Sequence, residues 1–248
     1  MRGLSQLCAT QVRLFLREPA AAFFTLAFPS LLLIVFGSVF GNQPMTQWGL
    51  EFGYVDLQVP ALAAIIIGNV GLVGIPVATA TARESGYLRR LRATPLRPVT
   101  WITADVLVNL AMSALGMIVL ILLAKVLFGL RFAGSWAVVS LAFVFAALAI
   151  FAMGYLLAGL AGTARIAQTV GMAFFFPMMF LSGAALPRQV MPSAVQRVAD
   201  FLPLTHLVAM LQSAWAGDGL GPRQPAVLWL AATLVVSTAL AVRLFRWE

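Results

Sequence analysis

Six runs of about twenty mainly apolar residues constrain the fold of this chain more than any other feature of its sequence. A helix of about 20 residues crosses a hydrocarbon layer of about 30 Å. Of the 248 residues, 62% are hydrophobic and 10% are charged, whereas a soluble globule shows water a more mixed surface. A transmembrane β-barrel would instead show alternating polarity in segments of about ten residues. The sequence therefore predicts an all-α membrane protein with six transmembrane helices. The predicted spans are Ala20–Phe40, Val59–Ala82, Thr100–Leu127, Trp136–Leu160, Ile166–Ala185 and Ala226–Leu244.

Basic residues are distributed unequally between the two sides of the predicted membrane. With the N-terminus inside, 11 of the 16 lysines and arginines lie on the cytoplasmic side and 5 lie outside. Because cytoplasmic loops carry an excess of Lys and Arg, this count places both termini in the cytoplasm. The same bias accounts for the formal charge of +8. The charge therefore indicates membrane lipid, rather than nucleic acid, as the charged partner of this chain.

Two segments outside the spans have patterns of their own. Residues 1–19 carry apolar side chains at helical spacing with polar ones mostly opposite, which predicts an amphipathic helix in the membrane interface. Residues 186–224 are apolar but contain charges and four prolines, so we expect two short outer helices, about Ser193–Phe201 and Thr205–Trp215. These helices either re-enter the membrane before the last span or form an interfacial hairpin outside the bundle. No repeat or linker interrupts the chain, which indicates a single domain, residues 1–248.

The chain lacks the residues of several common catalytic sites. A P-loop needs a lysine directly after a glycine, but the single lysine, Lys125, follows an alanine. The single histidine, His206, has no carboxylate within five residues, and we interpret it as a polar residue at a helix start. One cysteine, Cys8, allows neither an internal disulfide nor a cysteine metal cluster. We therefore expect no enzyme activity, and neither a metal nor a cofactor bound by this chain.

Asp105 is the one carboxylate predicted to lie inside a span, within about two turns of its cytoplasmic end. Asn109 lies one turn further along the same helix face. Ion-driven carriers place ionisable groups in their spans, so a secondary multidrug carrier that titrates Asp105 is one alternative function. A single acid near the membrane surface does not by itself establish such coupling.

The segment RESGYLRRLRATPLRP, residues 83–98, carries five of the sixteen basic residues and lies between predicted spans two and three. Gly86 allows the chain to turn off the preceding helix, and two prolines end any helix that follows. Between them, Tyr87, Leu88 and Leu91 form an apolar edge flanked by arginines, which fits a cleft on a soluble partner. A basic loop lying on anionic headgroups is the alternative, but it needs neither a glycine turn nor a proline stop. The ordered pattern therefore favours a short docking helix.

This segment resembles the loop between spans two and three in the membrane permeases of type-two ATP-binding cassette (ABC) exporters, which reads as a variant of R-E-R-G-T-L-x-x-L-x-x-T-P-L-R-P. Ser85 and Tyr87 depart from the usual Arg and Thr. Tyr54–Pro60 resembles the family's Y-x-D-F-x-x-P entry to span two, and Leu181–His206 resembles its outer re-entrant helices. The resemblance covers nearly the whole chain. The matching residues of the loop are Arg83, Glu84, Gly86, Leu88, Leu91, Thr94, Pro95, Leu96, Arg97 and Pro98.

The resemblance implies a coupling helix that docks on a separate ABC ATPase subunit, and ATP and Mg²⁺ would bind to that partner. It also implies a bacterial inner membrane permease that pairs with a second copy or with a homologous permease. Gly68, Gly71 and Gly74 would allow close helix approach in such a dimer, or equally within one subunit. The residues assigned to ATPase coupling are Arg83, Glu84, Gly86, Leu88, Arg89, Arg90, Leu91, Thr94 and Pro95.

Polar positions within the spans, and the Phe-Pro-Met stretch of span five, are the candidates for a substrate path. Pro177 removes a helix hydrogen bond, and the neighbouring Phe and Met side chains form a deformable apolar wall. These features favour efflux of a hydrophobic or amphipathic drug or lipid-like substrate, as in antibiotic resistance. Two different functions also fit the sequence, namely export of a lipid-linked polysaccharide and a membrane scaffold without transport activity. The candidate pathway residues are Asn69, Asp105, Asn109, Gln168, Phe176, Pro177, Met178 and Ser182.

Overall fold

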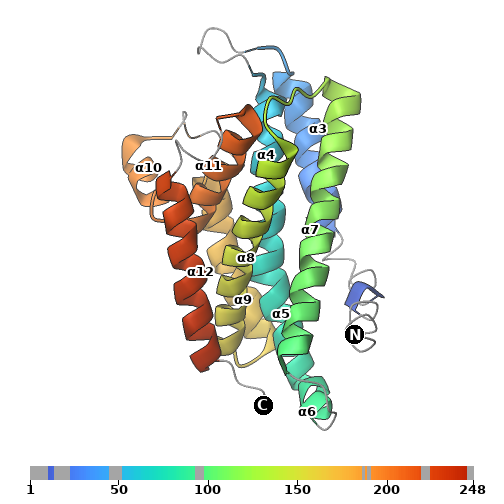
Figure 1. Cartoon of the computed structure of the whole chain (residues 1–248), viewed down its shortest axis with the longest axis vertical. Helices are drawn as coiled ribbons and strands as arrows, with labels where there is room; N and C mark the ends of the chain where they lie inside the picture. Colours follow the sequence, from blue (N-terminus) through green and yellow to red (C-terminus); the bar gives the residue numbers. More distant parts are fainter. Residues whose placement is uncertain are drawn as a thin grey trace.

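Long helices lying side by side make up the part of the chain that the structure describes (Figure 1). In these ranges every regular element is helical, and six helical segments are long and apolar enough to cross a bilayer. For the described residues, the prediction of an all-α fold with six candidate transmembrane helices is therefore confirmed. The computed structural model describes residues 11–13, 23–44, 52–92, 98–185, 188, 191–218 and 224–244.

The six candidate spans lie close to the predicted ones. The second begins five residues earlier than expected. There the Asp56 carboxylate accepts a hydrogen bond of 2.9 Å from the Gly53 N–H, which caps the start of the helix. The spans are Phe23–Phe40 (η1, Phe23–Ala27, and α3, Phe28–Phe40), Tyr54–Glu84 (α4, Tyr54–Asn69; η3, Val70–Gly74; α5, Ile75–Glu84), Thr100–Phe128 (in α7, Pro98–Phe128), Trp136–Leu160 (α8), Ala164–Leu181 (α9) and Gln224–Leu244 (α12).

Two other predicted boundaries differ from the structure. The fifth span ends at Leu181, not Ala185, because the chain turns there and Gly183 adopts a φ of +87° that favours glycine. Of the predicted amphipathic helix, residues 1–19, only 11–13 are described, and these are helical. The rest of that prediction lies outside the described residues.

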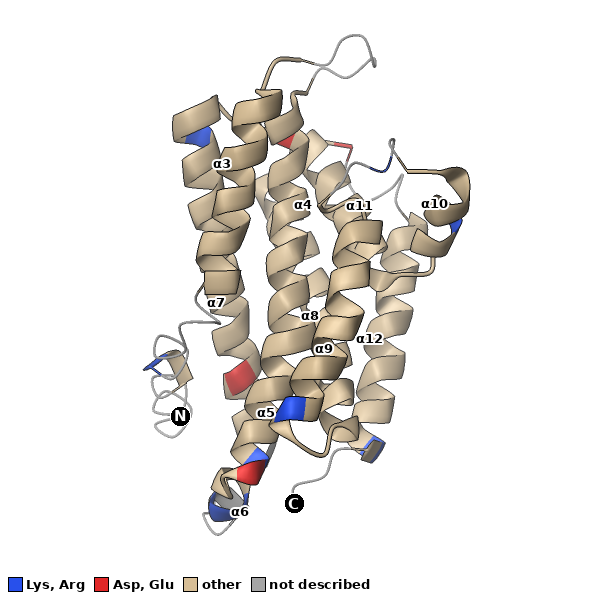
Figure 2. Cartoon of the chain, turned by 180° about the vertical axis from the view of Figure 1, so that it is seen from behind, with Lys and Arg blue, Asp and Glu red and all other residues tan. Residues whose placement is uncertain are grey.

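The second span forms the core of the bundle. In its most apolar window 72% of residues are buried, against 22% to 28% for the first, third, fifth and sixth spans. α4 contacts α3, α7 and α11, and α5 contacts α8 and α9, so the span lies between its neighbours (Figures 1 and 2). Its near-continuous apolar sequence from Ala61 to Ile67 is what such an all-round buried helix requires.

Close helix packing at the middle of the core depends on glycine. A Cβ on Gly154 of α8 would collide with the carbonyl oxygen of Gly71, and one on Gly71 would lie 2.6 Å from Ile150 Cγ2. A Cβ on Gly68 would meet Leu204 and Phe175 at 3.2 Å. Gly68 and Gly71 therefore serve packing within the subunit, the second of the two roles predicted for them.

The segment before the last span contains two short helices, as predicted. α10 extends from Ser193 to Ala199, and α11 from Pro203 to Ala216. α11 packs against α4, α8 and α12, and its Leu207, Leu211 and Trp215 side chains are fully buried. The alternative of a hairpin outside the bundle is therefore wrong for α11, because its apolar face belongs to the common core.

Candidate functional site

The short helix α6, Tyr87–Arg92, leaves the core at one end of the bundle, where charged residues gather (Figure 2). Gly86 makes the turn with a φ of +66°, a conformation that other residues adopt only with strain. The Gly86 N–H donates to the Arg83 carbonyl (3.0 Å) and the Arg90 N–H donates to the Gly86 carbonyl (3.1 Å). The Arg90 guanidinium also donates to the Ser85 carbonyl (3.3 Å). α6 is thus bonded to the end of α5 rather than loosely tethered.

Arg83 and Glu84, the last two residues of α5, are bonded to neighbouring helices. Arg83 Nη1 donates to the Ala161 carbonyl (3.0 Å) and Nη2 donates to the Ala158 carbonyl (3.1 Å), at the end of α8. Glu84 Oε1 accepts a hydrogen bond from the Ala164 N–H (3.2 Å), at the start of α9. A cation at a helix C-terminus and an anion at a helix N-terminus both match the helix dipole.

The surface of α6 differs from the predicted docking edge. The Leu88 side chain is fully buried, so the expectation that it enters a cleft on a partner is wrong. Arg89 and Arg90 are exposed, and Tyr87 is half-buried. The side chain of Leu91, and the residues Thr94 and Pro95, lie outside the described part of the chain. Two arginines therefore form the described outward surface of α6.

The other end of the central span is held by the buried carboxylate of Asp56. It accepts hydrogen bonds from Gly53 N (2.9 Å), Asn42 Nδ2 (2.9 Å) and Arg131 N (2.8 Å). Asn42 Nδ2 also donates to the Phe128 carbonyl (3.2 Å). The Asp56 side chain thus joins the end of α3, the start of α4 and the α7–α8 connection, which explains why an acid stands in the motif at the entry to this span.

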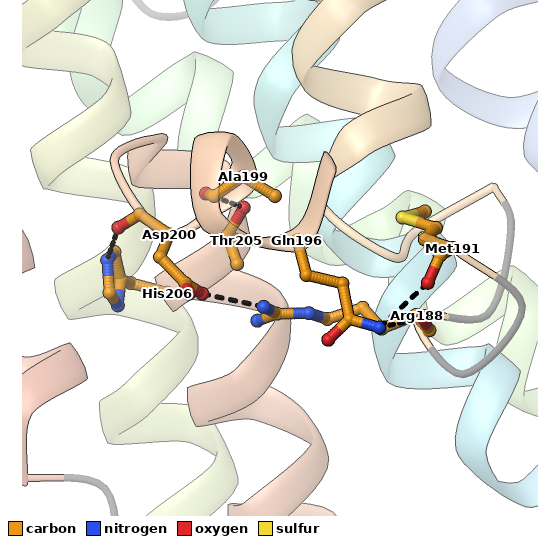
Figure 3. A network of polar contacts seen from close by, with 7 residues as sticks. All are labelled: Arg188, Met191, Gln196, Ala199, Asp200, Thr205 and His206. Carbon is orange, nitrogen blue, oxygen red and sulfur yellow. Dashed lines mark hydrogen bonds and ion pairs between the residues drawn. The ribbon is translucent and has the colours of Figure 1, made fainter. Parts of the chain in front are cut away.

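A second polar network holds α10 against α11 (Figure 3). Arg188 and Asp200 form an ion pair of 2.6 Å, and Thr205 Oγ1 donates to the Ala199 carbonyl (2.7 Å). His206 Nε2 lies 2.8 Å from the Asp200 carbonyl oxygen, at the start of α11 as predicted. Among the described residues, no group of three or more His, Cys, Asp or Glu could hold a metal. The contacts give this network a structural role.

The predicted pathway residues lie on several elements and differ in burial. Asp105 is buried and accepts a hydrogen bond of 2.5 Å from Tyr155 Oη of α8, while Asn109 Nδ2 donates to the Asp105 backbone carbonyl (2.9 Å). Asn69 is half-buried at the end of α4. Ser182 is fully buried in the turn after α9, where its hydroxyl bonds Met179 O and Ala184 N, both at 3.3 Å.

The pathway residues of α9 fall on different sides of that helix. Gln168, Phe176 and Pro177 are exposed, whereas Met178 is buried. The helix continues through Pro177 to Leu181. The predicted pathway positions therefore belong to four elements, α4, α7, α9 and the turn after α9.

Several partners of these residues were not predictable from the sequence. Tyr155 is 50 residues from Asp105, and the Arg131 N–H is 75 residues from Asp56. Arg83 and Glu84 bond to backbone groups of alanines. Because every residue carries such groups, a backbone partner leaves no signature in the sequence.

Six long apolar helices in one bundle define this chain as a polytopic α-helical membrane protein. Residues 2–215 match the model of the family described as ABC-2 type transporter, and the chain belongs to this family. It is 28% identical over 176 residues to the inner membrane transport permease YhhJ of Escherichia coli (strain K12), covering 67% of this chain and 46% of that protein. The permease of the same name from Shigella flexneri matches with the same values. The chain spans about half the length of the curated relatives it matches.

The family resemblance inferred from the motifs is thereby confirmed. The matched region is a membrane permease domain, the non-catalytic part of a transporter, which lacks a nucleotide-binding site. Members of this family generally pair with ABC ATPase subunits.

Proposed function

We propose that the chain is a single permease domain, residues 1–248, that forms an export path for a hydrophobic or amphipathic drug or lipid-like substrate. A second copy or a homologous permease completes the path, and a separate ABC ATPase subunit drives it by binding ATP and Mg²⁺. The protein lies in the bacterial inner membrane with both termini in the cytoplasm. Residues 1–19 form the interfacial helix, 83–98 the coupling loop and 186–224 the re-entrant outer helices.

One observation carries the assignment of the coupling loop. α6 leaves the central span at a positive-φ glycine, is bonded back to that span, and presents exposed Arg89 and Arg90. A mechanical link between an ATPase and a membrane gate needs an element that both can displace, and α6 is continuous with the most buried helix of the bundle. The scarcity of charge within the spans supports a lipophilic cargo.

Copurification tests the proposal. The tagged permease is isolated from its host and the associated proteins are examined for a P-loop ATPase, whose ATP hydrolysis is then measured with and without the permease in lipid nanodiscs. We expect such a subunit to copurify and its hydrolysis to depend on the permease. Transport that follows a pH gradient, does not depend on ATP and is lost in Asp105→Asn would instead establish the secondary carrier. If the protein shows neither ATP-driven nor pH-driven transport, the membrane scaffold is the function that remains.

The orientation is tested separately. In a Cys8→Ser background, a cysteine at Tyr87 should react with a membrane-impermeant maleimide in inverted vesicles but not in intact cells. Labelling of intact cells would place α6 outside and would contradict both the orientation and the ATPase coupling.

A further inference from the structure

We infer that Arg83 and Glu84 are positioning residues, which transmit a displacement of α6 to the ends of α8 and α9 instead of contacting the ATPase. This inference rests on the proposed function, since it assigns roles within the same coupling loop. It concerns two adjacent residues at the Glu84 end of the central span, and the α8–α9 turn to which they are bonded.

Arg83 holds the end of α8. Its two terminal nitrogens donate to the Ala158 and Ala161 carbonyls at 3.1 and 3.0 Å. The last carbonyls of a helix have no partner within it and lie at the negative end of the helix dipole. A planar guanidinium can bridge two such carbonyls at once, whereas a lysine ammonium lacks that fork. Arg83 therefore fastens the final turn of α8 to α5.

Glu84 holds the start of α9. Its carboxylate accepts the N–H of Ala164, the first residue of α9, at 3.2 Å. The first N–H groups of a helix are unpaired within the helix and lie at its positive end. Two consecutive residues of α5 thus hold both sides of the short α8–α9 turn, residues 161–163. α5 also packs along α8 and α9 directly, so the three helix ends form one unit.

The connection from α6 to this unit is short and hydrogen-bonded. α6 is joined to α5 through the Gly86 turn, and the Gly86 N–H itself bonds the Arg83 carbonyl (3.0 Å). A push on the exposed arginines of α6 consequently reaches Arg83 and Glu84 within one turn of chain. From there it reaches α8 and α9 as well as α5, so a motion at α6 is distributed over three helices.

Docking and transmission make opposite demands on these residues. A docking residue presents its charge to the partner, as the exposed Arg89 does on α6 itself. Arg83 instead directs both terminal nitrogens, and Glu84 directs Oε1, to backbone groups of their own chain. Loss of a docking residue weakens ATPase binding, whereas loss of a transmitting residue leaves binding intact and reduces the effect of the permease on hydrolysis.

The experiment compares Glu84→Ala, Glu84→Gln and Thr163→Ala in nanodiscs with the copurifying ATPase. Glutamine keeps an oxygen that accepts the Ala164 N–H. Thr163 is the matched control, because its hydroxyl caps the same helix start by accepting the Ile166 N–H (3.2 Å) without connecting it to α5. Binding of the ATPase and permease-dependent ATP hydrolysis are measured for each variant, with Arg89→Ala as the docking control.

We expect Glu84→Ala to lower permease-dependent hydrolysis by about fivefold to tenfold, because the start of α9 loses its connection to α5 and such changes in coupling are of this size. Its ATPase binding should stay within about twofold of the wild type, and Glu84→Gln should retain most of the hydrolysis. Thr163→Ala weakens the cap of α9 but leaves the connection to α5, so its permease-dependent hydrolysis should stay within about twofold of the wild type. A loss of binding in Glu84→Ala as large as that in Arg89→Ala would overturn the inference. An equal loss of hydrolysis in Thr163→Ala would do the same, since the effect would then be helix fraying.

A measurement without the ATPase separates this inference from the proposed function. Amide hydrogen exchange at Ala164 should be faster in Glu84→Ala than in the wild type and unchanged in Arg89→Ala. If no ATPase binds the wild-type permease, the proposed function is wrong, yet this exchange pattern would still support the link between α5 and α9. Unchanged exchange in Glu84→Ala would overturn the link whatever the ATPase does.

Discussion

The two ends of the central span both use charged side chains to bind neighbouring segments of the chain, but they do so differently. At the Tyr54 end one carboxylate, Asp56, is fully buried and accepts three N–H groups. At the Glu84 end two residues of opposite charge divide the task, and Glu84 is exposed. A buried carboxylate resists separation from its donors because the carboxylate itself would be left unpaired away from water.

The difference between the two ends indicates which end of the span is fixed in place. Water can replace the partner of the exposed Glu84–Ala164 hydrogen bond, so this bond breaks and re-forms at lower cost than the buried bond between Asp56 and the Gly53 N–H. We therefore regard the Asp56 end as an anchor and the Arg83–Glu84 end as a movable link, and the following variants test this contrast from the largest effect to the smallest.

The largest effect is expected at the anchor. Asp56→Ala leaves the buried Gly53 N–H and the part-buried Asn42 and Arg131 donors without their common acceptor, which should destabilise the protein by about 3 kcal/mol. Thermal unfolding in detergent measures this loss. Asp56→Asn keeps one acceptor oxygen and should lose less. Equal stability of Asp56→Ala and the wild type would contradict the anchor.

The packing of the span against α8 should be the next most sensitive feature. Gly154→Ala places a methyl group against the Gly71 carbonyl, which is backbone and cannot rotate away, so we expect a loss of about 1 to 3 kcal/mol. Gly162→Ala, where nothing lies within 4 Å of the added carbon, is the matched control and should have little effect. The unfolding midpoints of the two variants decide the comparison. A stabilised Gly154→Ala would show that the helices are free to separate.

The turn into α6 should show a smaller effect on stability and a specific effect on coupling. Gly86→Ala forces a side chain into a φ of +66°, at a cost of about 1 to 2 kcal/mol. Gly129→Ala bears the same strain at the other end of the bundle, at a φ of +63° with open space around it. We expect similar unfolding midpoints for both but a loss of permease-dependent hydrolysis in Gly86→Ala alone. A matching loss in Gly129→Ala would attribute the effect to strain in general.

The smallest effect is expected in the α10–α11 network. The Arg188 and Asp200 side chains are 34% and 55% exposed, and such surface ion pairs contribute about 1 kcal/mol at most. Arg188→Ala should therefore change the unfolding midpoint by only a few degrees, and less at high salt. A loss as large as that of Asp56→Ala would show that this network, too, is an anchor.

The fold could be predicted where it depends on properties of contiguous residues. The apolar runs indicated six spans, and Gly86 and the prolines after it indicated a short helix between spans two and three. The burial of Leu88 could not be predicted, because an apolar residue beside arginines is equally suited to a partner's cleft and to its own core. The roles of Gly68 and Gly71 also stayed open until Leu204, Phe175 and Ile150 were placed against them.

By itself, the sequence determined that this chain crosses a membrane, how often it does so and where a basic helix leaves the second span, because hydrophobicity and backbone freedom are local properties of residue types. Only the tertiary structure decided that Asp56 anchors one end of that span and that Arg83 and Glu84 hold the α8–α9 turn at the other. Those contacts join residues 75 to 80 positions apart in the sequence. In each of them a charged side chain bonds to a backbone group, which every residue has, so the partner cannot be recognised from the sequence.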